Sequence, residues 1–356
     1  MIPLHKVLMS DKVIPALTKT LESGYVAQGP KVEEFEAALE EILGAKVLTL
    51  NSCTSALDLA LHLCSVDSKS EVISTPVTCT ATNAPIALRS AKIVWADVDP
   101  VTGNIDPKDV ARKITRRTAA IVVVDWAGRP CDYDALRAVS KGVPIIEDAA
   151  HAFGATYNGK PIAQSGGDYV CWSFQAIKHL NTGDGGAIKV PDSQYDRAKK
   201  LRWYGMDREP GAHFKQNIQE SGFKYHMNDI CATIGLANLK EAKEAVIKQR
   251  VIAYTYSQDL HLKKIKLPPY TIESSWWLYC ILVDKQLNFM NFMEQKGITC
   301  SPVHGRNDRH EAFYSYYDLP GVKEFSNHEV AIPVGWWLSE SNYNHIVDSI
   351  KEWDGI

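Results

Sequence analysis

Several features that mark other classes of protein are absent from this sequence of 356 residues. No apolar run approaches the ~18 residues that a membrane-spanning helix needs. Lysine and arginine, 39 in all, are outnumbered by 42 acidic residues, so the net charge of −3 lacks the basic excess of a nucleic-acid-binding protein. Residues 1–6 show no apolar signal-peptide core. We therefore expect a cytoplasmic protein that binds neither nucleic acid nor a membrane.

Cysteine is present, but not at the spacings typical of a metal site. The chain has no C-x-x-C pair, and its eight cysteines stand far apart, at positions 53, 64, 79, 131, 171, 231, 280 and 300. Their even number is compatible with disulfides, whereas their scatter through a long chain favours reduced thiols in the cytoplasm. We expect reduced cysteines and no metal.

The composition predicts a folded chain of about two domains. Hydrophobic residues make up 45% and charged residues 23% of the sequence, which is typical of globular proteins. At about 150 residues per domain, the length predicts roughly two domains. We place the boundary near residue 245, which gives a large domain at 1–245 and a small domain at 246–356.

Predicted helices and strands alternate through the large domain. Helices are predicted at 13–23 and 30–43, and a glycine follows each of them. Further on, helix-length segments such as 55–63 and 133–140 separate short apolar runs. The predicted strands are 46–50, 71–75, 92–96, 120–125, 143–147, 169–173 and 186–190. This alternation predicts an α/β fold with a mainly parallel sheet, whose ligands bind beyond the carboxyl ends of the strands.

A different pattern begins after the last of these strands. The polar, glycine-rich segment 206–223 is predicted to leave the domain as an excursion, which could form a hairpin. A long helix is predicted next, and then a smaller α+β segment. The predicted elements are a helix at 227–254, a strand at 277–283, a helix at 287–296, a strand at 298–303 and a helix at 343–353.

The first candidate site follows strand 46–50, in residues 51–57 (N-S-C-T-S-A-L). Small hydroxyl residues turn the chain there, and a helix begins. The N–H groups at the start of that helix, together with the hydroxyls of Thr54 and Ser55, suit a phosphate group. Simple capping of the helix by serine or threonine explains the same pattern.

The second candidate site ends a buried strand, in residues 143–151 (V-P-I-I-E-D-A-A-H). The strand delivers two acids, Glu147 and Asp148, at its carboxyl end. One carboxylate could hold a cationic ring nitrogen, and His151 could bind a neighbouring oxygen. A capping acid and a core histidine are the alternative.

The third candidate site is residues 173–186, where a strand ends at Ser173 and a glycine-rich run leads into the next strand. Lys178 stands between them in an apolar stretch. A lysine that is desolvated in a pocket loses its proton more easily and can form a Schiff base. A surface lysine in a loop is the alternative.

Together, the three sites meet the needs of pyridoxal phosphate. They provide a phosphate anchor, a carboxylate for the ring nitrogen and a lysine that can bind the aldehyde. The carboxylate keeps the pyridine nitrogen protonated, so that the ring can accept electrons from a carbanion.

These motifs, in this order, resemble those of the DegT/DnrJ/EryC1/StrS family of pyridoxal-phosphate-dependent nucleotide-sugar aminotransferases. Residues 24–36 (G-Y-V-A-Q-G-P-K-V-E-E-F-E) are similar to the family pattern G-x-x-x-x-G-P-x-V-x-x-F-E. Residues 52–57 are similar to S-G-T-x-A-L, and residues 147–151 and 173–186 match closely. The resemblance covers nearly the whole chain and implies fold type I, with a large domain on a mainly parallel sheet and a smaller C-terminal α+β domain.

The resemblance also implies a role for each matched residue. Lys178 is implied to be the catalytic Schiff-base lysine. Cofactor contacts are implied for Asp148 at the pyridine nitrogen, Ala150 against the ring, His151 near the ring hydroxyl, and Thr54, Ser55 and Ser173 at the phosphate. The family works as homodimers in which the partner completes each active site, and residues 222–227, with Lys224, resemble the contributing segment.

The chain departs from the family pattern at three places. Cys53 replaces the usual glycine, and Cys79 replaces an aromatic residue that stacks on the ring, so a thiol is implied beside the cofactor. Residues 224–227 read K-Y-H-M in place of N-x-R-M. Lys224 could still contact the phosphate as a point charge.

The resemblance implies transamination, with glutamate donating its amino group to a keto carbon of a nucleotide-linked deoxysugar, as in O-antigen or other glycan biosynthesis. Two alternatives stay open. One is dehydration at C3 of a 4-ketosugar, for which relatives replace the lysine by histidine; here His179 follows Lys178. The other is an inactive relative with a regulatory role.

Weaker signals come from two single residues and two tryptophan pairs. His304 lies where relatives bring a C-terminal residue toward the sugar, although a structural histidine is an alternative. Tyr204 could contact substrate or the partner subunit. The tryptophan pairs at 276–277 and 336–337 are predicted to be core or interface aromatics rather than a platform for a nucleobase.

Overall fold

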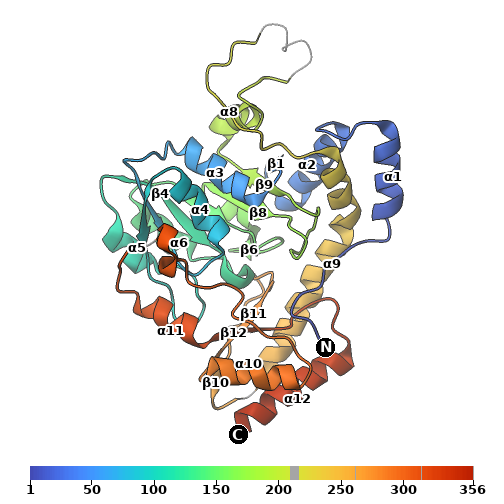
Figure 1. The fold of residues 1–356 in the computed structure, drawn as a ribbon, viewed down its shortest axis with the longest axis vertical. Coiled ribbons are helices and arrows are strands. Elements are labelled where there is room, and N and C mark those ends of the chain that lie inside the picture. The colour runs from blue at the N-terminus through green and yellow to red at the C-terminus, as the bar shows by residue number, and fades with distance from the viewer. Residues whose placement is uncertain (209–215, 261, 314, 356) are drawn as a thin grey trace.

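The computed structural model describes residues 1–208, 216–260, 262–313 and 315–355. A larger part is built on a seven-stranded sheet, and a smaller part on a three-stranded sheet (Figure 1). The long helix α9 (Asp229–Asp259) runs from one part to the other. Residue 245 lies inside this helix, and the division of the chain into two domains there stays a prediction.

The seven-stranded sheet is mainly parallel. Its order is β1-β9-β8-β5-β4-β2-β3. In that order, the strands are Leu48–Leu50, Gly186–Lys189, Tyr169–Ser173, Ile145–Asp148, Thr118–Val124, Glu71–Ser74 and Lys92–Trp95. Strand β9 is antiparallel to both of its neighbours, and every other pair is parallel. The predicted α/β fold with a mainly parallel sheet is confirmed.

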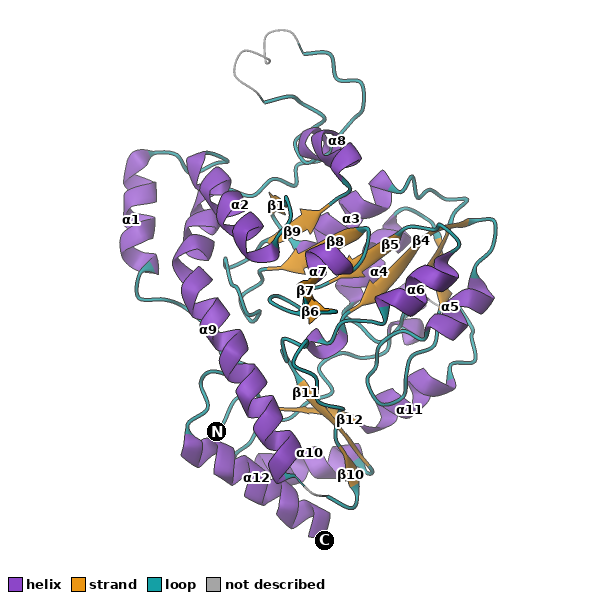
Figure 2. Ribbon diagram, turned by 180° about the vertical axis from the view of Figure 1, so that it is seen from behind, coloured by secondary structure: helices purple, strands orange, loops and turns teal. Residues whose placement is uncertain are grey.

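Helices cover both faces of this sheet (Figure 2). Its strands carry apolar side chains on each face, so each face must be buried. Val122 and Ile146 belong to the core that also contains the apolar residues of α3. Their neighbours Ile121 and Ile145 belong to the core of α5 and α6. The helices of this part are α3 (Cys53–Leu63), α4 (Thr80–Leu88), α5 (Pro107–Lys113), α6 (Tyr133–Ser140), α7 (Ile162–Ser165) and α8 (Tyr195–Leu201).

The first two helices have the predicted bounds. Helix α1 (Val13–Ser23) and helix α2 (Pro30–Leu43) end at Gly24 and Gly44, with φ angles of 76° and 70°. Glycine adopts this left-handed conformation without the steric cost that other residues carry. Both helices pack against α9 (Figure 2).

The smaller part combines three antiparallel strands with three helices. The sheet order is β10-β11-β12. The elements are β10 (Ile265–Lys266), β11 (Tyr279–Val283), α10 (Gln286–Gln295), α11 (Pro320–His328), β12 (Glu329–Ile332) and α12 (Glu340–Gly355). A short hairpin, β6 (Thr156–Tyr157) and β7 (Lys160–Pro161), lies in the larger part.

The strand predicted at 298–303 is wrong. Only isolated bridges occur there, one between Ile2 and Ile298 and one between Ser301 and Ala331. Pro302 has no N–H to donate to a ladder, and Val303 has a φ of 55°, so the chain turns away from the sheet.

The predicted excursion at 206–223 follows α8. Residues 209–215 of it lie outside the described residues. At its base, the backbone N–H of Asp207 donates to Oε1 of Gln216 (3.1 Å), and Nε2 of Gln216 donates back to the Asp207 carbonyl. None of the helices in the described ranges has the length and apolar character of a membrane span.

The buried carboxylate of Asp229 joins α2 to α9. It accepts the backbone N–H groups of Gly29 (2.8 Å), Lys31 (3.1 Å) and Val32 (3.1 Å). We expect Asp229→Asn to lower the free energy of unfolding by about 2 kcal/mol. Asparagine has an NH₂ group in place of one carboxylate oxygen, and this group would face a backbone N–H that then has no acceptor. Urea denaturation measures the change. The exposed Asp192→Asn is the control, and an equal loss in both variants would contradict this role.

Candidate active site

One cavity of about 580 Å³ brings the three sequence motifs together. It lies at the carboxyl ends of β4, β5 and β8, beside the N-terminal ends of α3 and α4. The predicted residues that line it are Thr54, Cys79, Asp148, Ala150, His151, Ser173, Lys178 and His304. The carboxyl edge of a parallel sheet is the expected place for a ligand.

The start of α3 forms one wall. The hydroxyl of Ser52 accepts the N–H of Ser55 (3.0 Å) and caps the helix. The Ser55 hydroxyl donates to Oδ1 of Asn51 (2.7 Å), and Ser55 does not line the cavity. Ser52 and Thr54 do line it, so hydroxyl groups and the positive helix end face the same space.

Gly186 lets strand β9 pass close to this helix start. A Cβ at position 186 would lie 2.6 Å from the backbone nitrogen of Cys53. Real Cβ atoms do not approach backbone so closely, so any other residue would push the strand away from α3. The glycine at the end of the third motif therefore supports the first motif.

The two acids of the second motif point to opposite sides of the sheet, because side chains alternate along a strand. Asp148 lines the cavity. Its Oδ2 accepts the hydroxyl of Thr82 (2.7 Å), and its Oδ1 accepts the N–H of Ala150 (3.0 Å). Burial raises the pKa of Asp148, and the Thr82 hydrogen bond opposes that shift. Asp148 is therefore the carboxylate that can hold a ring nitrogen.

Glu147 lies on the other face, in contact with the buried carboxyl group of Asp125. Its Oε2 accepts the N–H of Gly167 (2.6 Å), while Oδ1 of Asp125 accepts the hydroxyl of Tyr133 (2.7 Å). The remaining oxygen of each carboxyl has no donor within the described ranges. Burial raises the pKa of both groups. One proton shared by the pair satisfies both oxygens.

Lys178 stands in the turn that follows β8. Its N–H donates to the Gln175 carbonyl (2.8 Å), which closes this turn. The side-chain Nζ lies 3.5 Å from the centre of the Trp277 ring. The residue is half-buried, and desolvation of its amine lowers the pKa to about 8. An amine with such a pKa is partly unprotonated near neutral pH and can act as a nucleophile or a base.

Three histidine rings stand around this lysine. The rings of His151 and His5 lie 4.0 Å and 4.8 Å from that of Trp277, and both are stacked on it. The ring of His304 lies nearly parallel to that of His151, at 6.1 Å. Burial, aided by the charge of Lys178, lowers the pKa of all three imidazoles. They are neutral near pH 7.

Two thiols adjoin the acid and the start of α4. The Sγ atom of Cys53 lies 4.0 Å from Oδ1 of Asp148, and burial raises the pKa of this thiol. Cys79 stands directly before α4 and lines the cavity. All eight cysteines of the chain are free thiols in this structure.

Two more predicted site residues lie outside this cavity. Lys224 is exposed, and its backbone bridges to Trp203. Tyr204 follows at the end of α8, with a φ of 56°. Neither residue lines the cavity of its own chain. Their roles therefore stay predictions that involve a second subunit.

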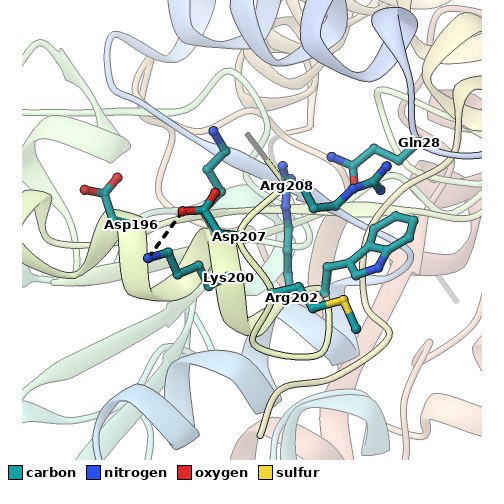
Figure 3. Close-up of a pocket in the computed structure, with 9 residues that line it drawn as sticks. Gln28, Asp196, Lys200, Arg202, Asp207 and Arg208 are labelled. Carbon is teal, nitrogen blue, oxygen red and sulfur yellow. Dashed lines mark ion pairs between the residues drawn. The ribbon is translucent and has the colours of Figure 1, made fainter. Parts of the chain in front are cut away.

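A second cavity, of about 230 Å³, lies beside α8 (Figure 3). Several cations line it, but carboxylates already hold two of them. Lys200 pairs with Asp207 (3.7 Å), and the buried Arg202 pairs with Glu36 (2.5 Å). We therefore assign the chemistry to the first cavity, where Lys178 is desolvated.

Among the lining residues of the first cavity that sequence analysis did not assign to the site are His5, Thr82 and Trp277. His5 belongs to no motif. Thr82 lies three residues after Cys79, in the P-V-T-C-T-A-T run of residues 76–82, and could have been noticed there as a hydroxyl at a helix start. Trp277 was predicted to be a core aromatic, and it is buried, but its ring also faces Lys178.

Comparison with known proteins gives a consistent result. A model of the DegT/DnrJ/EryC1/StrS aminotransferase family matches residues 8–351. The sugar aminotransferase CalS13 from Micromonospora echinospora is 37% identical, with a TM-score of 0.94 over 99% of this chain and 100% of that chain. PseC from Helicobacter pylori, an aminotransferase involved in the biosynthesis of pseudoaminic acid, is 25% identical, with a TM-score of 0.90 over 99% and 98%. The spore coat polysaccharide biosynthesis protein SpsC from Bacillus subtilis is 30% identical over 99% of this chain and 96% of its own.

The shared proton predicts a pH dependence of stability. An unfolded glutamate ionises near pH 4.3, whereas folded Glu147 keeps its proton to higher pH. The folded state therefore binds more protons, and the free energy of unfolding falls as pH rises through this window. Glu147→Gln, which keeps an N–H donor toward Asp125, should make that fall shallower by about 1 kcal/mol per pH unit.

Urea denaturation between about pH 5 and pH 9 measures this slope. The exposed Glu22→Gln on α1 is the control and should follow the wild-type curve. An unchanged slope in Glu147→Gln would show that the pair does not share a proton.

Proposed function

Because this chain belongs to the DegT/DnrJ/EryC1/StrS aminotransferase family, we propose that it transfers the amino group of glutamate to a keto carbon of a nucleotide-linked deoxysugar. That it is a sugar aminotransferase of fold type I rests on the family match and on the neighbouring structures. The donor, the nucleotide link and the keto group are our inferences. The observation that carries them is the gathering of Lys178, Asp148 and the α3 start in one cavity.

Enzymes of this family use pyridoxal phosphate, and the cavity residues fit it. The start of α3 with Thr54 and Ser173 would hold the phosphate. Asp148 would hold the ring nitrogen. Nδ1 of His151 is buried and has no partner in the described part of the chain, which leaves it for the ring hydroxyl. When bound, the cofactor supplies a ring that withdraws electrons from the reacting carbon.

Lys178 would act twice. Its Nζ would bind the cofactor covalently in the resting enzyme, which requires the unprotonated amine that burial favours. Once released by an incoming amine, Nζ would take a proton from the reacting carbon of the donor and deliver one to that of the acceptor. The ring of Trp277, whose centre lies 3.5 Å away, would hold the amine in place while it carries that proton.

The neighbouring histidine argues against the dehydratase alternative. His179 is buried, and its Nε2 contacts the Ser275 carbonyl (3.2 Å). It does not line the main cavity, whereas Lys178 does. This arrangement supports a lysine as the reacting group, as an aminotransferase needs. The desolvated amine also argues against an inactive relative. Desolvating an amine costs free energy, and an inactive protein would gain nothing from that cost.

We also propose a cytoplasmic homodimer with shared active sites. Lys224 and Tyr204 are exposed on their own chain and lie outside its cavity. In a dimer, Lys224 of one subunit could contact the phosphate bound by the other, as the family resemblance implies. Its amine would then add a positive charge to a phosphate site that otherwise relies on hydroxyls and a helix end.

The decisive experiment uses cofactor-loaded protein, glutamate and a panel of GDP-, dTDP- and UDP-linked 4-keto-6-deoxysugars, with products read by mass spectrometry. The expected product gains an amine, whereas the dehydratase alternative loses water. Lys178→Ala should lower turnover on the order of 10³-fold or more, because it removes both the covalent attachment and the proton transfer. It should also abolish the visible absorbance of the lysine-bound cofactor.

Lys351→Ala, an exposed lysine on α12, is the control and should keep wild-type turnover and absorbance. Turnover in Lys178→Ala equal to that of the control would overturn the assignment of the lysine. Absence of amine transfer to every ketosugar would overturn the proposed reaction.

Thr82 should orient Asp148 for the cofactor. Thr82→Val removes the hydroxyl that donates to Oδ2 of Asp148 (2.7 Å). We expect the Kd for pyridoxal phosphate to rise about tenfold, through the loss of one hydrogen bond to a charged group. Absorbance titration measures it, and Thr82→Ser should restore the wild-type value. An unchanged Kd in Thr82→Val, with the half-buried Thr255→Val on α9 as control, would contradict this role.

A further inference from the structure

The N-terminal segment of the chain forms a strap that joins the two parts of the molecule. We define this strap as residues 1–10. At one end, Ile2 exchanges backbone hydrogen bonds with residues 297–299 of the smaller part (2.7 and 3.0 Å). At the other end, the carbonyl of Leu8 accepts the side-chain amide of Asn181 in the larger part (2.8 Å). His5 lies between these two anchors, so its backbone is held from both sides.

The strap brings the ring of His5 to the reacting lysine. His5 lines the same cavity as Lys178. Its ring stacks on Trp277, with centroids 4.8 Å apart and an interplanar angle of 18°. The stack fixes the plane of the imidazole, and Nε2 is enclosed without a hydrogen-bond partner among the residues that the structure describes.

His304 repeats this arrangement from the smaller part. It lines the cavity, and its Nε2 is also enclosed and unpartnered within the described ranges. Its ring lies edge-on to that of Trp126, with centroids 5.8 Å apart. A buried nitrogen without a partner costs free energy, so two such atoms in one cavity indicate groups that a ligand satisfies.

The charge of the two rings identifies the kind of ligand. Burial lowers the pKa of both His5 and His304 to about 4, so both are neutral near pH 7. A neutral imidazole offers one N–H donor and one acceptor nitrogen. A hydroxyl group also donates and accepts, and it matches such a ring, whereas a carboxylate only accepts. The described lining of the cavity includes no arginine that would favour an anion there.

We propose that His5 binds a hydroxyl group of the sugar ring, beside the sugar contact already expected of His304, and that His5 is a specificity-determining residue for the acceptor. The proposal rests on the proposed function, because it assigns the acceptor sugar to this cavity. It differs from the phosphate and ring contacts, which hold the cofactor. It predicts that the strap acts in the half-reaction with the sugar and not in the half-reaction with glutamate.

The test measures the two half-reactions separately on the holoenzyme. The absorbance change of the cofactor follows the reaction with glutamate, and the reverse change follows the reaction of the aminated enzyme with the ketosugar that the wild type accepts best. In His5→Ala, we expect kcat/KM for the sugar to fall about tenfold, mainly through KM. The glutamate half-reaction should stay within about twofold.

Two further variants separate recognition from packing. In His5→Gln, the side-chain amide can occupy the place of Nε2, and it should recover most of the affinity that His5→Ala loses. His345→Gln alters an exposed histidine on α12 and should match the wild type in both half-reactions. A thermal unfolding scan of each variant reports any change in stability.

Three outcomes overturn the proposal. One is an unchanged sugar half-reaction in His5→Ala. Another is an equal slowing of both half-reactions, which would make His5 a support for Lys178. The third concerns binding of dTDP-glucose, UDP-glucose and GDP-mannose to the holoenzyme, measured by calorimetry. If the wild type binds none of them, or binds them no better than His5→Ala does, the assignment of His5 is wrong. If binding depends on His5 but no amine is transferred, only the proposed reaction is wrong.

Discussion

The desolvation of one lysine and one carboxylate at the same sheet edge is the constraint on which the rest of the site depends. Burial disfavours the charge on Lys178 and the charge on Asp148, and each of these charges partly offsets the cost of the other. Further charge would upset this balance. The groups nearest to the pair are accordingly neutral: the imidazoles of His5, His151 and His304 are unprotonated, and the Cys53 thiol stays protonated.

The fold delivers these groups from segments that lie far apart along the chain. Asp148 ends β5, Lys178 follows β8, and the start of α3 follows β1, so three strand ends of the sheet meet at one edge. The smaller part adds the ring of Trp277, and the N-terminal strap adds His5. The cavity is therefore closed by segments that only the tertiary structure brings together. Its walls depend on the packing between the two parts, and not on the sheet alone.

Local motifs predicted the site residues that stand directly after the strands of the sheet. Lys178, Asp148 and His151 could be found because each stands where a run of apolar residues ends, a pattern that is visible in the sequence. Residues without such a local pattern could not be found in this way. His5 reaches the cavity through backbone pairing with residues 297–299, and this pairing leaves no periodic signal. The predicted strand at 298–303 failed for a related reason, because a proline and a residue of positive φ override its β-branched character.

The turn after β8 determines whether Lys178 or His179 faces the cavity. The N–H of Lys178 closes a turn onto Gln175, which leaves the lysine on the cavity side. His179 does not line this cavity; burial lowers its pKa to about 3, and its ring contacts the Ser275 carbonyl. A shift of one residue in this turn would exchange a primary amine for an imidazole at the position that faces the cavity. An imidazole can move a proton but cannot hold an aldehyde covalently as an amine does. The register of this one turn therefore decides whether the cavity can support amine transfer.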